Sequence, residues 1–152
     1  MGHYVGVSFS FSVCSLRRLK QVANETICEI HLAEGYDTEK FNRSYTLVML
    51  KNAADNTEKY IHYGNKGDMF IWGGVWNYYD ALEEIPYLKF FLKKCWGYCN
   101  SRDGVFFDFD KALLIVNHEQ SHESEIYEFG LNEETKGVDV RETKIDLNWG
   151  QM

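Results

Sequence analysis

The chain contains a single proline, Pro86, in 152 residues. It has no run of about 18 apolar residues that could span a bilayer. Its first residues also lack the basic region, the apolar stretch and the small-residue cleavage site of a secretory signal. We therefore predict no membrane segment and a cytoplasmic location. The scarcity of proline, together with 45% hydrophobic and 16% aromatic residues, argues against global disorder.

Several motifs of reactive or metal-binding proteins are missing as well. The four cysteines, Cys14, Cys28, Cys95 and Cys99, form neither a C-x-x-C pair nor the Cys and His spacing of a zinc module. We interpret them as buried free thiols. The sequence has no G-x-S-x-G nucleophile elbow and no phosphate-binding loop. We therefore assign no catalytic residue, no metal ligand and no cofactor.

Basic residues are absent from one long segment of this chain, whose formal net charge is −7. Between Lys111 and Lys136 there is no lysine or arginine. The same segment contains six glutamates: Glu119, Glu123, Glu125, Glu128, Glu133 and Glu134. A one-sided acidic surface repels nucleic acid and phosphate-rich membranes and attracts basic protein surfaces. The charge pattern predicts a basic protein partner and neither nucleic-acid nor membrane binding.

The first half of the chain shows both strand and helix periodicity. Strict alternation of apolar and small polar residues over 5–13 predicts a strand with one buried side. A short helix capped by Ser15 is predicted over 15–24. For 28–32 we favour a strand over a continuation of the helix through Ile27 and Ile30.

Further strands are predicted around a glycine-bounded turn. Residues 34–43 are polar and indicate a loop, and the apolar run at 45–50 indicates a strand covered on both faces. The segments 59–63 and 68–72 flank a turn bounded by Gly64 and Gly67, as in a β-hairpin.

The second half predicts a long helix followed by strands. Apolar residues recur at helical spacing over 77–99, with Asn77 as the cap and Pro86 as the site of a kink or division. The strands predicted after it cover 105–109, 112–116 and 126–129, then a terminal pair within 138–149, with 117–124 as a polar connection. The predicted architecture is α+β. It is one domain, 1–152, with a mostly antiparallel sheet of about six to eight strands and the helices of 77–99 and 15–24 packed on one face.

A five-residue motif offers a catalytic alternative. His118-Glu119-Gln120-Ser121-His122 matches H-E-x-x-H and resembles the zincin metallopeptidases. The resemblance implies a helix on which His118 and His122 bind zinc and Glu119 acts as general base. The polar residues around the motif leave such a helix without an apolar face, so a polar hairpin connection is the favoured interpretation.

Aromatic residues crowd one part of the chain. Tyrosine and tryptophan are common in interface hot spots because they give a large contact area at a small entropic cost. Packing in the core is the favoured role for most members of this group, which comprises Trp72, Trp76, Tyr78, Tyr79, Tyr87, Trp96 and Tyr98.

Small size, acidity and the absence of catalytic motifs make the whole chain similar to the cytoplasmic immunity proteins that bacteria pair with secreted toxins. The resemblance implies a non-catalytic inhibitor that covers the basic active-site cleft of a cognate, nuclease-type toxin. An adaptor subunit of a larger assembly is a further alternative. The residues predicted to contact the partner are Glu119, His122, Glu123, Glu125, Tyr127, Glu128, Glu133 and Glu134.

Overall fold

A computed structural model of the chain confirms the predicted α+β fold. The structure describes residues 4–13, 16–35, 38–64, 67–99, 111–119, 123–132 and 134–146. Its elements in chain order are β1 (Val5–Val13), α1 (Leu16–Glu34), α2 (Thr38–Arg43), α3 (Tyr45–Asp55), the 3-10 helix η1 (Thr57–Tyr60), β2 (Ile61–Gly64), β3 (Gly67–Trp76), α4 (Ala81–Cys99), β4 (Ala112–His118), β5 (Glu123–Leu131) and β6 (Val138–Asp146).

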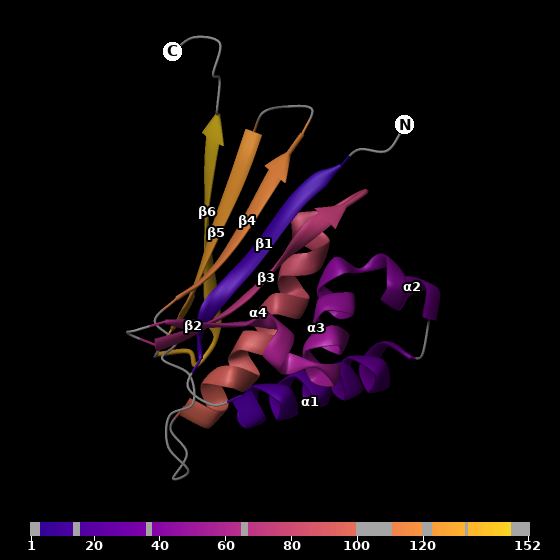
Figure 1. Ribbon diagram of the computed structural model, residues 1–152, viewed down its shortest axis with the longest axis vertical. Helices are drawn as coiled ribbons and strands as arrows, with labels where there is room; N and C mark the ends of the chain where they lie inside the picture. Colours follow the sequence, from indigo (N-terminus) through magenta and orange to yellow (C-terminus); the bar gives the residue numbers. More distant parts are fainter. Residues whose placement is uncertain are drawn as a thin grey trace.

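The described strands form one antiparallel sheet in the order β2-β3-β1-β4-β5-β6. The first strand of the chain lies in the middle, between β3 and β4. Figure 1 shows the helices gathered on one side of this sheet, with α1, α3 and α4 nearest to one another. The hairpin of β2 and β3 is confirmed, with Gly64 paired to Gly67 across its turn.

The alternation in β1 explains why the sheet has one buried face. Phe9 and Phe11 point toward the helices and are buried, whereas the serines between them are on the other face. The Phe11 ring lies 5.1 Å from that of Phe70 in β3 and 5.9 Å from that of Phe91 in α4. Aromatic pairs at these separations join the strand to the helix layer.

Helix α1 is longer than the sequence predicts, and the strand expected at 28–32 is wrong. The apolar residues of that segment do not share a buried face: Ile30 is buried, but Leu32 is 80% exposed and Cys28 is also exposed. The alternative of a helix that continues through Ile30 is therefore the correct one. The helix ends where Gly35 adopts a positive φ of 82° and donates its N–H to the carbonyl of His31.

Helix α3 replaces the strand predicted at 45–50. Ser44 is its N-cap, since its Oγ accepts a hydrogen bond of 3.2 Å from the Leu47 N–H. The apolar run continues through Ala53 and Ala54, both buried, and so has the length of a buried helix. A short apolar run does not by itself distinguish a buried strand from a buried helix.

The limits of the other helices also differ from the prediction. The segment 34–43 contains α2, where a loop was expected. Helix α4 begins at Ala81 because Asp80, and not Asn77, accepts the N–H of Leu82 on its side chain. It runs without division through Pro86. None of the described helices is long and apolar enough to cross a membrane.

The described C-terminal strands are longer than predicted. Much of the expected polar connection at 117–124 belongs to strands, since β4 extends to His118 and β5 starts at Glu123. A single strand, β6, replaces the terminal pair as far as residue 146. The predicted strand at 105–109 and the last part of 138–149 lie outside the described residues.

Two glycines are expected to respond oppositely to alanine. A Cβ at Gly74 would lie 3.0 Å from the Tyr45 hydroxyl, whereas one at Gly97 in α4 meets nothing within 4 Å. We expect Gly74→Ala to lower the free energy of unfolding by about 1 kcal/mol through crowding. Gly97→Ala should raise it by about 0.5–1 kcal/mol, because alanine has the higher helix propensity. Urea unfolding of both variants tests this, and the same sign of change in both would contradict it.

Candidate functional site

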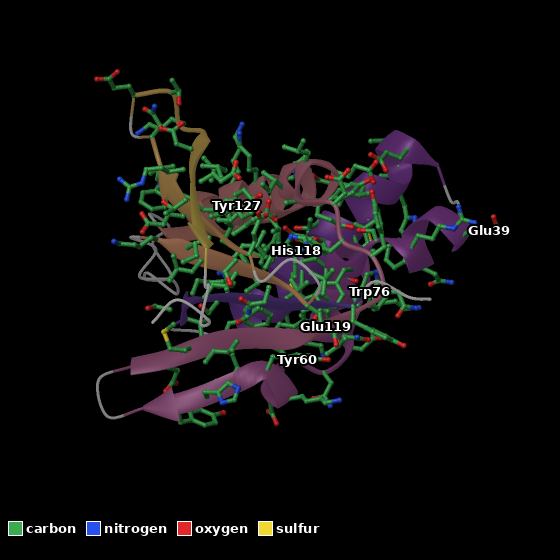
Figure 2. All side chains as sticks on the ribbon, turned by 90° about the horizontal axis from the view of Figure 1, so that it is seen from above. Glu39, Tyr60, Trp76, His118, Glu119 and Tyr127 are labelled. Atoms are coloured by element: carbon green, nitrogen blue, oxygen red, sulfur yellow. The ribbon has the colours of Figure 1, made fainter. Side chains whose placement is uncertain are left out.

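One end of the sheet brings together residues from distant parts of the chain. There β1 begins, β3 and β4 end and β5 begins (Figure 1). Val5 is paired with Trp76 on one side and with His118 on the other. Viewed from above, Trp76, His118 and Glu119 lie near one another (Figure 2).

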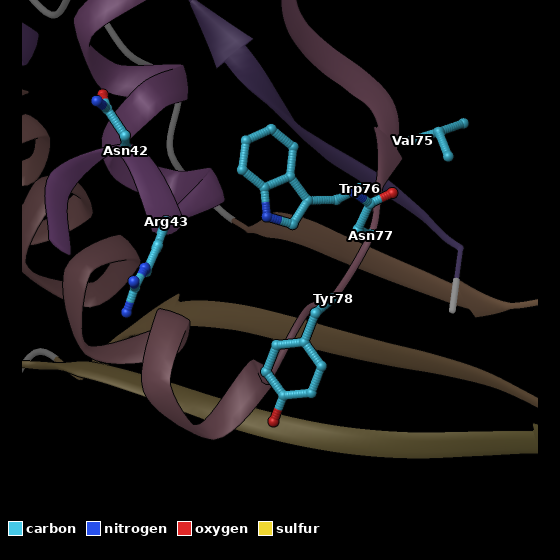
Figure 3. A pocket seen from close by; sticks show the side chains of 6 residues that line it. All are labelled: Asn42, Arg43, Val75, Trp76, Asn77 and Tyr78. Carbon is cyan, nitrogen blue, oxygen red and sulfur yellow. The ribbon is translucent and has the colours of Figure 1, made fainter. Parts of the chain in front are cut away.

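A first hollow, of about 550 Å³, lies between α2 and the loop that follows β3. Asn42 and Arg43 line it from the last turn of α2, and residues 75–78 line it from the other side. In Figure 3 the Trp76 ring lies toward α2, while Val75 points away from it. The hollow is therefore bordered by a guanidinium, an indole and the Tyr78 phenol.

A second hollow, of about 460 Å³, adjoins the first, since Val75 lines both. Tyr4 and Glu119 line it from opposite strand ends, and the Glu119 N–H donates to the Tyr4 carbonyl at 3.4 Å. We call the region around the two hollows the apical surface. It comprises Tyr4, Asn42, Arg43, Val75, Trp76, Tyr78, His118, Glu119 and Glu123.

Large apolar and aromatic side chains are exposed on the apical surface. Tyr4 is 50% exposed, Val75 68% and Tyr78 67%. Leu82, in the first turn of α4 and four residues after Tyr78, is exposed as well. Grouped exposed side chains of this kind are typical of surfaces that bind another protein.

Beneath the apical surface a histidine is paired with a carboxylate. His118 Nε2 lies 2.9 Å from Glu125 Oε2, and both side chains are partly buried. Residue alternation puts both on the helix side of the sheet, next to buried Tyr127. Burial, then the negative charges of Glu125 and Glu142, raise the pKa of the Tyr127 phenol.

The buried tyrosines make stability sensitive to alkaline pH. The pKa values of Tyr45, Tyr79 and Tyr127 are all raised, mainly by burial, above the usual value of about 10. Between pH 10 and the folded-state pKa the unfolded chain loses these protons and the folded chain keeps them. The free energy of unfolding should therefore fall as the pH rises above about 10.

Urea unfolding between about pH 8 and 11, with tyrosinate absorbance in parallel, tests this expectation. Tyr127→Phe should weaken the pH dependence, because one of the shifted groups is removed. Constant stability across this range, or simultaneous ionisation of all ten tyrosines of the chain in the folded state, would contradict it.

Comparison with known proteins finds no matching family model, no matching curated protein and no matching solved structure. The chemistry of the apical surface must therefore be interpreted from its own residues. Exposed Glu119 and Glu123 offer carboxylates to cationic groups, and Tyr4 and Tyr78 offer aromatic faces. This combination suits lysine and arginine side chains of a partner, which bind both carboxylates and aromatic rings.

The predicted glutamates do not form one outward face. Glu119 and Glu123 are exposed at the apical end, whereas Glu134 is exposed in the turn beyond the far end of β5, about 27 Å away along the strand. Glu125 is on the helix side, and Glu128 is on the opposite side. The reason is geometric. Successive side chains of a strand point to opposite faces of the sheet, and the length of β5 keeps residues at its two ends far apart.

Other members of the predicted contact set have different positions. Tyr127 is only 3% exposed, so as placed it cannot contact a partner. Glu128 lies 3.6 Å from the Arg141 guanidinium and is partly neutralised by it. His122 and Glu133 lie outside the described residues.

The described part of the H-E-x-x-H motif is not helical. His118 is the last residue of β4 and Glu119 lies in a turn. On a helix two histidines four apart lie on adjacent turns of one face, whereas in an extended chain they are about 13 Å apart and cannot hold one zinc ion. The described part of the motif therefore does not provide the helix that the zincin arrangement needs. Among the residues that the structure describes, no group of three His, Cys, Asp or Glu side chains is arranged to hold a metal ion.

The sequence prediction included the two apical carboxylates, Glu119 and Glu123, but most of the exposed aromatic and apolar residues around them were not part of it. Within the aromatic group, Trp72 and Tyr79 are buried, as favoured, and Tyr78 is exposed. Asn77 and Tyr78 interrupt the apolar pattern between β3 and α4, which could have indicated a surface loop. No sequence signal distinguishes Tyr4.

Proposed function

We propose that the chain is a non-catalytic binding protein that docks its apical surface on a basic protein. The observation that carries the proposal is the juxtaposition of exposed Glu119 with exposed Tyr4, Val75 and Tyr78 around two adjoining hollows. Exposed Glu123 begins the neighbouring strand β5 at the same end of the sheet. Carboxylates accelerate encounter with a basic surface, and aromatic anchors slow dissociation.

Within this class, an immunity protein that neutralises a nuclease-type toxin is the function that we favour. A nuclease cleft is basic because it binds phosphates, and an acidic surface with aromatic anchors is complementary to it. Such a protein acts in the cytoplasm, catalyses no reaction and needs no cofactor. Nucleic acid and membrane surfaces, which are negatively charged, are repelled by a chain of net charge −7.

The immunity function makes a genetic prediction that co-expression tests. The gene immediately upstream should encode a toxic, basic protein. Cells that express this neighbour alone should stop growing, and cells that also express the present chain should grow. Failure of the chain to protect, with both proteins expressed in soluble form, would reject the immunity function.

An adaptor role is the second candidate, because an acidic and aromatic surface can equally hold a subunit in an assembly. It predicts a stable complex with a basic protein that is harmless when expressed alone. The same co-expression experiment distinguishes the two candidates, since only a toxin requires protection.

A further inference from the structure

The second hollow of the apical surface has a glycine between two of its walls. Gly6 is paired with Val75 on β3 and with Asn117 on β4, and all three residues line the hollow. They lie in the rows that face away from the helices, because the neighbouring β1 residues are the buried ones. A Cβ at Gly6 would meet nothing closer than the Asn117 Cβ, at 3.7 Å. The space of about 460 Å³ is therefore kept open by the missing side chain at position 6.

Two other residues of the hollow carry groups that bind cations. Tyr4 and Glu119 follow Gly6 and Asn117 toward the strand ends, and the Glu119 N–H donates to the Tyr4 carbonyl at 3.4 Å. Tyr4 is 50% exposed, and Glu119 is exposed as well. A phenol ring and a carboxylate therefore border the same space.

The remaining walls of the hollow are apolar or uncharged. Val75 offers its two methyl groups and is 68% exposed. The Asn117 carboxamide is held in place by the Ser124 hydroxyl, which donates to its Oδ1. His118 contributes to the lining between Asn117 and Glu119, but its Nε2 is paired on the helix side of the sheet. The lining that the structure describes thus combines a carboxylate with an aromatic ring and contains no lysine or arginine.

We propose that the second hollow receives one arginine side chain of the basic partner, an inference that rests on the proposed function. A guanidinium is planar and weakly hydrated, so it can stack on the Tyr4 ring and donate a pair of hydrogen bonds to the Glu119 carboxylate. Its methylene stem passes over Gly6 and packs against Val75. A lysine ammonium is a compact, strongly hydrated charge and has no flat face to stack. The hollow therefore selects arginine over lysine, and Gly6 is the residue that lets the side chain enter.

Binding of a small arginine derivative tests the hollow without the partner. N-acetyl-arginine amide is titrated into the full chain, and the backbone amide signals are followed by NMR. We expect a dissociation constant on the order of 10 mM, because one exposed carboxylate and one ring bind a cation weakly. The shifts should concentrate at Gly6, Val75 and Asn117. N-acetyl-lysine amide has the same charge and should bind at least about threefold more weakly.

Gly6→Val fills the hollow with a side chain that suits a strand. The variant should fold, since a Cβ at this position has room. Its affinity for the arginine probe should fall at least about tenfold, because the added methyl groups occupy the site. The matched control is Ser10→Val, which adds the same side chain to the same row of β1 about 13 Å away and should leave the affinity unchanged. Circular dichroism checks the fold of both variants.

Substitutions at Tyr4 provide a second test that leaves Gly6 in place. Tyr4→Leu removes the aromatic ring and should weaken binding of the arginine probe about three- to fivefold. Tyr4→Phe keeps the ring and should retain the affinity. Loss of binding in Gly6→Val and Tyr4→Leu, with binding kept in Ser10→Val and Tyr4→Phe, supports an arginine site.

Three results would overturn the proposal: absence of probe binding, equal affinity for the arginine and lysine probes, or unchanged affinity in folded Gly6→Val or Tyr4→Leu. Each of them differs from a failure of the proposed function, because protection in co-expression needs no arginine in this hollow. Conversely, a chain that binds the arginine probe but does not protect cells would reject the immunity function and leave the arginine site standing.

Discussion

Glu84→Ala should lower the free energy of unfolding by about 2–4 kcal/mol. The Glu84 side chain is buried, and its Oε2 accepts hydrogen bonds from the Ser44 hydroxyl at 2.7 Å and the Thr46 N–H at 3.2 Å. With alanine at position 84 both donors lose their acceptor in a buried region, which costs about 1–3 kcal/mol of stability for each donor. Urea unfolding measures the loss.

Two further variants separate the hydrogen bonds from other effects. Glu83→Ala removes the neighbouring carboxylate, which is exposed in the first turn of α4, and should change stability by less than about 0.5 kcal/mol. Glu84→Gln keeps the size of the side chain and one oxygen acceptor, and should retain most of the stability. Equal effects of alanine at positions 83 and 84 would contradict this role of Glu84.

Glu84 also connects the fold to the apical surface. It joins the start of α4 to the start of α3, where Ser44 is the N-cap. Arg43, immediately before Ser44, and Tyr78, shortly before α4, lie on opposite sides of the first hollow. Loss of the Glu84 hydrogen bonds should therefore weaken the packing of the helix layer and also make the residues that line the first hollow more mobile.

The sheet was predictable where burial is one-sided. In β1 the apolar residues occupy every second position because a single face packs on the helices, and this period of two specifies a strand from the sequence alone. The turn between Gly64 and Gly67 similarly indicated the hairpin. The α+β fold followed from these elements and from the helical spacing of 77–99.

The helices α1 and α3 show where local patterns are insufficient. Ile30 alternates with polar neighbours as in a strand, yet it is the last of several α1 residues that are buried at helical spacing. In α3 both sides are largely buried, so the 45–50 segment has no periodicity that distinguishes helix from strand. Only the cap at Ser44 and the continuation to Ala54 indicate the helix.

The candidate site was predictable in part. The absence of basic residues around β5 drew attention to Glu119 and Glu123, and the structure places both as exposed residues at the apical end. Their contact with a partner stays a prediction. Proximity in sequence could not reveal that Glu134 lies at the other end of the strand. Tyr4 and Tyr78 join the site only through strand pairing between distant segments, which no local pattern encodes.

Charge reversal at the apical surface should slow partner binding strongly. In the double variant Glu119→Lys/Glu123→Lys we expect the association rate constant to fall at least about tenfold at low salt, because long-range attraction to a basic partner is lost. The dependence of that rate on ionic strength should become flatter for the same reason. Dissociation should change less, since both residues are exposed at the margin of the surface.

The matched control is Glu58→Lys/Glu134→Lys. Both glutamates are exposed and lie away from the apical surface, Glu58 in η1 and Glu134 in the turn after β5. Each double variant makes the formal net charge of −7 less negative by four. A difference between the two variants therefore reports the position of the charges and not their sum.

Stopped-flow association with the basic protein encoded by the neighbouring gene, measured over a range of salt concentrations, tests the role of the apical surface most directly. We expect the apical variant to bind slowly and with little salt dependence, while the control stays within about twofold of the unmodified chain. Equal rates for the two variants would show that the partner does not dock on the apical surface.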